Sequence, residues 1–226
     1  MADHQLPGTP SIALLLRRSA RAKRISLRIS QLDGRVTLTL PKGVPDTEAL
    51  DFAQSKERWI RGHLAARPPD ATMTFGELIS IEGRDRRIVA APGRRVLLRD
   101  DEIAVPAGSE AKSLQSWLRS YARNQVAAAS DFYATALGRD YTRITVRDTR
   151  SRWGSCSAEG ALMYSWRLIL APPEVLRYVA AHEVAHLAEM NHSQAFWDVV
   201  ERLYGAYQAP RSWLRDNGAG LHRYRF

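Results

Sequence analysis

The feature that most constrains this chain is the segment HEVAHLAEMNHSQAFW, residues 182–197, which holds three of its six histidines. His182 and His186 are four residues apart in this segment. In an α-helix this spacing turns about 40° beyond one full revolution, so both side chains lie on the same face. The segment therefore predicts a helix with two imidazoles that point in one direction.

The flanking residues predict where this helix begins and ends. Pro172-Pro173 suits a first turn, where a missing N–H group costs nothing, and Glu174 complements the positive end of the helix dipole. We expect the helix to run to about Met190, because Asn191 tolerates the left-handed conformation that ends helices. Ser193 can then cap a second helix.

Two imidazoles on one helix face can bind one metal ion. Glu183 lies about 100° around the axis from His182, where it can reach a water molecule bound to that ion. A catalytic zinc site needs three protein ligands and an open position, and zinc lowers the pKa of the water there. His192 is the preferred third ligand because it follows the expected helix end, and Asp198 and Glu201 are the alternatives.

A helix that carries histidines only on its polar side would show the same spacing. Apolar residues surround the histidines here, however: Ala181, Val184, Ala185 and Leu187. The segment is therefore expected to be buried, and buried imidazoles beside a carboxylate need partners. A metal ion supplies such partners, so we favour a metal site.

Composition limits the class of protein. The chain has 226 residues, of which 45% are hydrophobic, enough for one large or two small domains. The apolar run 12–16 is too short for a secretion signal, and no stretch approaches a membrane span. The single cysteine, Cys156, cannot form an internal disulfide, which favours the cytoplasm.

The net charge of +9 raises the possibility of an anionic partner such as nucleic acid. Only four of the 33 basic residues are lysines, and the arginines are scattered from Arg17 to Arg225. We therefore favour a dispersed, solvated basic surface over a nucleic-acid interface.

The pattern of short strands and helices predicts an α+β fold. Alternation of apolar and polar residues with Asp33-Gly34 at the turn predicts a β-hairpin over 23–40, and a helix should follow over 46–66, ended by Pro68-Pro69. The remaining expectations are a meander of short strands over about 75–108, a helix over 110–137, and strands over 143–148, 151–157 and 162–170. We place a boundary near Pro106, between a β-rich region with one helix at 1–106 and a second domain at 107–226.

Four separated motifs carry a resemblance to a known family. SRWGSCS, WRLILAP, YVAAHEVAHL and NHSQAFW occur in this order, and the segment from RRSARAKRISLRIS to DGRVTLTLPKGVP adds to them. Together they resemble the YgjP-like zinc metallopeptidases, relatives of the WLM and SprT-type zincins. The resemblance covers nearly the whole chain.

This resemblance implies a minimal gluzincin-like catalytic domain with a small sheet and an active-site helix. It implies one zinc ion bound by His182, His186 and His192, with Glu183 as the general base of an HExxH peptidase acting on peptides or proteins. Metzincins have the same separation between their second and third histidines, but a glycine stands where this chain has Glu189.

Peptide hydrolysis also needs a donor that stabilises the oxyanion. Tyr164, Tyr178 and Arg152 are the candidates, and the strand that contains SRWGSCS could bind an extended peptide through its edge. Two other functions stay open: a nucleic-acid-associated protein, either a DNA-linked protease or a basic module with structural zinc, and an inactive zinc-binding scaffold.

The other residues that could bind ligands or react have simpler interpretations. Cys156 is expected to be a small buried residue, and Trp153 and Trp166 to belong to the core. The three remaining histidines, His4, His63 and His222, lack ligand spacing and are expected at the surface.

Overall fold

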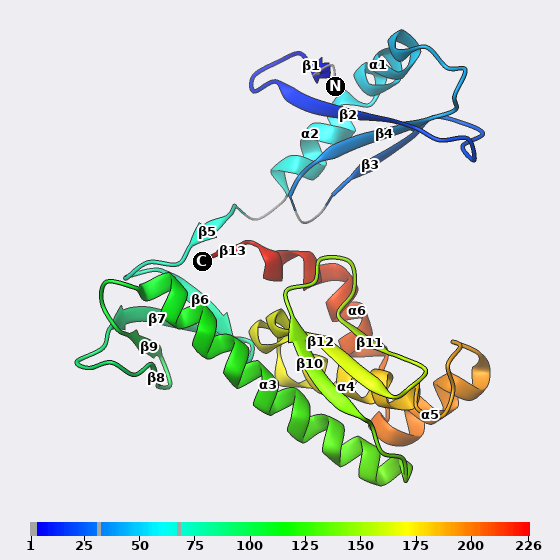
Figure 1. Cartoon of the computed structure of the whole chain (residues 1–226). Helices are drawn as coiled ribbons and strands as arrows, with labels where there is room; N and C mark the ends of the chain where they lie inside the picture. The colour runs from blue at the N-terminus through cyan, green and yellow to red at the C-terminus, as the bar shows by residue number, and fades with distance from the viewer. Residues whose placement is uncertain (1–3, 31–32, 67–68) are drawn as a thin grey trace. The chain divides into compact units, whose positions relative to one another are not determined.

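The computed structural model describes residues 4–30, 33–66 and 69–226, and the chain forms two compact units, 1–69 and 70–226 (Figure 1). The expected boundary near Pro106 falls inside the second unit. Residues on both sides of it, such as Ile103 and Leu118, belong to one continuous hydrophobic core. The β-rich segment after residue 70 is therefore part of the same body as the expected metal site.

The first unit is a four-stranded sheet with two helices. Its strands are β1 His4–Leu6, β2 Ile12–Arg18, β3 Ser26–Ile29 and β4 Val36–Leu40, in the order β1-β2-β4-β3. The helices are α1 Asp46–Ser55 and α2 Glu57–Ala65. The core contains fully buried residues from both kinds of element, Val36, Leu38, Ala53 and Ile60 among them.

The predicted hairpin is confirmed by antiparallel pairing of β3 with β4, in which Ser26 faces Thr39 and Ile29 faces Val36. Its loop is longer than the expected two-residue turn, because the Ser30 N–H donates to the Arg35 carbonyl at 2.9 Å. Gln31 and Leu32 of the hairpin lie outside the described residues.

The single helix expected over 46–66 is two helices. Lys56, with φ −105° and ψ 8°, separates α1 from α2. Apolar spacing continues across this break, so the sequence pattern does not reveal it. Pro68, expected to end the helix, lies outside the described residues.

The second unit begins with a small sheet. Its strands are β6 Leu78–Ile81, β7 Arg84–Ala90, β8 Leu97–Leu98 and β9 Glu102–Val105, in the order β6-β7-β9-β8. The expected meander is wrong, because β9 pairs in parallel with β7. Ile103 and Val105 of β9 are fully buried, so this strand takes the inner place and leaves the edge to β8.

The long helix α3, Glu110–Leu137, has the predicted bounds. Gly138 follows it with φ 70°, the left-handed conformation that ends a helix. A three-stranded sheet comes next, with β10 Arg143–Arg147, β11 Gly154–Cys156 and β12 Ala161–Ser165 in the order β10-β12-β11. Strand β11 thus lies at the sheet edge.

The expected strand over 162–170 is only half a strand. After β12 the chain forms a 3₁₀-helix, η1 Trp166–Leu170, in which all five residues are buried. A short, mostly apolar run does not distinguish a buried strand from a buried helical turn.

Helices complete the second unit and the termini of this unit pair with each other. The helices are α4 Pro173–Ala185, α5 Gln194–Tyr204, α6 Gln208–Asn217 and the 3₁₀-helix η2 Gly218–His222. Strand β13, Tyr224–Arg225, pairs in parallel with β5, Ala71–Thr72. Small sheets packed with helices make the chain α+β, as predicted, and no helix in the described part is long and apolar enough to cross a membrane.

Candidate metal centre

Helix α4 places the first two histidines, and it ends earlier than the sequence predicts. His186 already caps the helix, although we expected helical structure to Met190. The Leu187 N–H donates to the Val184 carbonyl, a tightening of the last turn. The His186 Nδ1 lies 3.0 Å from the Glu189 carbonyl oxygen, a contact that holds the chain in this turn.

The early helix end brings the third histidine back to the first two. The candidate ligand atoms of His182, His186 and His192 all lie within 4.8 Å of one another. The Nε2 atoms of His182 and His192 are 3.1 Å apart. Two nitrogens bound tetrahedrally to one zinc ion would be roughly 3.3 Å apart, so this spacing fits a shared ion.

The alternative ligands are not part of this cluster. Asp198 and Glu201 are exposed on α5, and the Asp198 carboxylate accepts a hydrogen bond from Gln194 Nε2 at 2.8 Å. Within the described ranges, the group that could hold a metal ion at this place consists of the three histidines and includes neither carboxylate.

The protonation of the histidines also fits a metal ion. Because His186 Nδ1 donates to the Glu189 carbonyl, its Nε2 is free to bind, an arrangement common around metal-bound histidines. Burial, with the neighbouring His186 and His192, lowers the pKa of His182 to about 3. The imidazole is therefore neutral near pH 7, which is the form that binds metals.

Aromatic rings surround the three histidines. The Phe196 ring lies 4.5 to 4.8 Å from the rings of all three histidines. Trp197 stands 5.7 Å from His182 and stacks on Tyr207, and Arg211 lies over Trp197 at 4.5 Å. Tyr207 precedes α6 and Arg211 lies within it, and no sequence pattern assigns either residue to the site.

Glu183 is buried beside the ligands, only 5% exposed. Burial raises the pKa of its carboxyl to about 8, and the charge of Arg152 acts in the opposite direction. No donor in the described part of the chain forms a hydrogen bond with this carboxylate. A bound cation would also favour its charged form.

The histidines open on a cleft of about 480 Å³. One wall is α4 with His192, and the other is the segment around the edge strand β11. The lining residues are Ser151, Arg152, Gly154, Ser155, Cys156, His182, Glu183, His186, Met190 and His192.

Of the three candidate oxyanion donors, Arg152 lines this cleft. Tyr164 is fully buried and its hydroxyl forms a 3.0 Å hydrogen bond with Ser130 Oγ, so it lies away from the cleft lining. Tyr178 is buried with its ring 6.0 Å from His182, and burial raises its pKa to about 12.

The expectations for the remaining residues have mixed outcomes. Trp166 is fully buried, whereas Trp153 and Cys156 are half-buried. His63 is exposed and His4 half-buried. The expectation that His222 lies at the surface is wrong: it is buried, with its ring 5.3 Å from Trp153.

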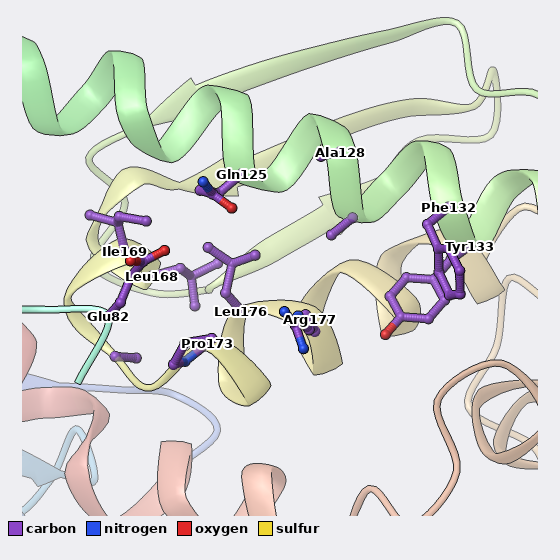
Figure 2. A pocket seen from close by; sticks show the side chains of 12 residues that line it. Glu82, Gln125, Ala128, Phe132, Tyr133, Leu168, Ile169, Pro173, Leu176 and Arg177 are labelled. Atoms are coloured by element: carbon purple, nitrogen blue, oxygen red, sulfur yellow. The ribbon is translucent and has the colours of Figure 1, made fainter. Parts of the chain in front are cut away.

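A second cavity, of about 510 Å³, lies between α3, η1 and the start of α4. Figure 2 shows Glu82 at one end and Phe132 with Tyr133 at the other. Its lining contains none of the three histidines. Volume alone does not identify a catalytic site, so the smaller cleft with the ligand cluster is the better candidate.

Comparison with known proteins identifies a family for this chain. A family model described as "YgjP-like, metallopeptidase domain" matches residues 23–217. No curated protein matches the chain. Among solved structures, the chain is similar to the metallopeptidase zymogen of Pyrococcus abyssi abylysin, with 21% identity, 43% of this chain and 92% of that chain covered, and a TM-score of 0.34. A likeness this weak carries no argument, so the family match is the informative comparison.

Proposed function

Since the chain belongs to the YgjP-like metallopeptidase family, we propose that it is a zinc-dependent peptidase with Glu183 as general base. The observation that supports this best is the convergence of three imidazoles within 4.8 Å beside a buried carboxylate, in an open cleft. Structural zinc is closed by a fourth protein ligand, and in the described chain no fourth His, Cys, Asp or Glu joins this group.

The ligands are His182, His186 and His192. A zinc ion bound there would polarise the scissile carbonyl and lower the pKa of a bound water. Glu183 takes the proton of the attacking water and later delivers it to the leaving amine. Burial raises the pKa of this carboxyl and a bound cation would lower it, and these opposing effects suit a group that must both accept and release a proton.

Substrate binding and oxyanion stabilisation involve the opposite wall. Strand β11 lies at the edge of its sheet, so an extended peptide can pair with its free side through main-chain hydrogen bonds. Arg152 is the preferred oxyanion donor, because it is the one candidate of the three that lines the cleft. Tyr178 is second, and the Tyr164 hydroxyl is already bonded to Ser130.

The other functions have less support. The comparisons give no indication of a nucleic-acid partner, and a cytoplasmic location stays a prediction based on the single cysteine. An inactive scaffold is distinguished from a peptidase by the assay below.

The test is cleavage of an unfolded protein such as casein by the full chain. We expect turnover that stops after removal of metal by a chelator, returns with zinc, and falls by about 100-fold or more in Glu183→Gln. Turnover that survives Glu183→Gln would contradict the assigned base. Zinc binding with no cleavage would favour the scaffold.

A further inference from the structure

Gly154 is the point at which the edge strand β11 meets the proposed base. Its φ is not in the left-handed region, so the backbone conformation does not require glycine. A Cβ atom built on Gly154 would lie 2.6 Å from Glu183 Cγ and 2.7 Å from Glu183 Cδ. Real Cβ atoms essentially never approach other atoms so closely. The reason for glycine here is therefore steric, and the side chain that needs the space is Glu183.

Strand β11 is not free to move away from this contact. Gly154 pairs with Tyr164 on β12, and the Ser165 N–H donates to the Trp153 carbonyl at 2.8 Å. The Trp153 ring packs closely against Gly218, where an added Cβ would be 2.9 Å from it. Main chain and side chain thus hold the strand beside α4 from two directions.

Glu183 leaves α4 between neighbours on the helix that are fully buried, Ala180, Ala181 and Val184. The close atoms include Cγ as well as the end of the side chain, so a small rotation of the carboxylate alone would not relieve the clash.

We propose that Gly154 is a positioning residue. Because it has no side chain, its backbone packs directly against Glu183 and keeps the Glu183 carboxylate beside the three histidines. A side chain at residue 154 would displace the carboxylate and leave the histidines in place, since the atoms it would meet first all belong to Glu183. The role in catalysis rests on the proposed function; the contact itself does not.

The contact is tested by a double-mutant cycle in thermal unfolding of the full chain. We expect Gly154→Ala to lower the midpoint by about 3–8 °C, as overpacking of a core does. In the Glu183→Ala background, where the space is empty, the same substitution should change the midpoint by no more than about 1 °C. Gly93→Ala is the matched control, because a Cβ there meets nothing within 4 Å. An equal drop in both backgrounds, or no drop with Glu183 present, would overturn the proposal.

The positioning role is tested by zinc content and casein cleavage of Gly154→Ala. We expect an unchanged zinc content and cleavage reduced by about 100-fold. A variant that binds zinc and cleaves as fast as the wild type would refute the role while the proposed function stands. If the wild type cleaves nothing, the proposed function fails. The double-mutant cycle in thermal unfolding then still decides whether Gly154 packs against Glu183 as described.

Discussion

Two ionisable side chains are buried to nearly the same depth in the second unit, and their surroundings differ completely. Arg167, 6% exposed, donates to both Asp148 carboxylate oxygens at 2.7 and 3.2 Å and to the carbonyls of Leu221 and Tyr224. Glu183, 5% exposed, has no such partner among the described residues and faces a cleft. A buried ionisable group with all its hydrogen bonds supplied inside the protein is structural. One left without partners next to three histidines that could hold a metal ion is available for chemistry.

Arg167 should therefore give the largest effect on stability. Arg167→Ala leaves the half-buried Asp148 carboxylate and two backbone carbonyls without their donor, so we expect a loss of about 3–5 kcal/mol in the free energy of unfolding. Urea unfolding of metal-free protein at pH 7 measures it. A loss below about 1 kcal/mol would contradict the claim that the hydrogen bonds of buried Arg167 stabilise the fold.

His222 is a third buried titratable group, and it lies near Arg167 and away from the cleft. Burial, followed by the charge of Arg167, lowers its pKa to about 4, from 6.5. Protons then bind preferentially to the unfolded state, so the contribution of neutral His222 is complete above pH 6.5 and is lost as the pH falls toward 4. Between pH 7 and pH 5 we expect wild type to lose about 2 kcal/mol more than His222→Gln.

That difference is read from urea unfolding of both proteins at the two pH values. Equal losses in wild type and variant would show that His222 is not buried as described.

At pH 5, Glu183 should give the smallest effect on stability. At pH 5 the raised pKa keeps the folded-state carboxyl protonated, so Glu183→Gln replaces one neutral group by another of the same shape. We expect a change within about 1 kcal/mol, in favour of the variant, in metal-free protein. The gain should grow as the pH rises toward 8, because the stability given by a group with a raised pKa is lost in that direction. A strongly destabilised Glu183→Gln variant would show that Glu183, like Arg167, has a structural role.

The sequence predicts those parts of the fold that depend on local pattern. The bounds of α3 follow from apolar spacing. The pairing of β7 with β9 depends instead on which strand is buried deepest, and the break at Lys56 interrupts a continuous helical pattern. These properties arise from packing between distant residues.

The candidate site shows the same division. The spacing of His182, His186 and His192 suggested the ligand cluster because two of them share one helix. The early end of α4, the packing of Tyr207 and Arg211 on Trp197 and the contact of Gly154 with Glu183 are not predictable. Each of them joins segments whose proximity only the fold determines.

The most direct measurement is zinc content by elemental analysis of full-length protein purified without added metal. Wild type should hold about one zinc per chain, His192→Ala should lose it, and Glu183→Gln should keep it. Full zinc retention in His192→Ala, or no metal in the wild type, would contradict the three-histidine centre on which the account depends.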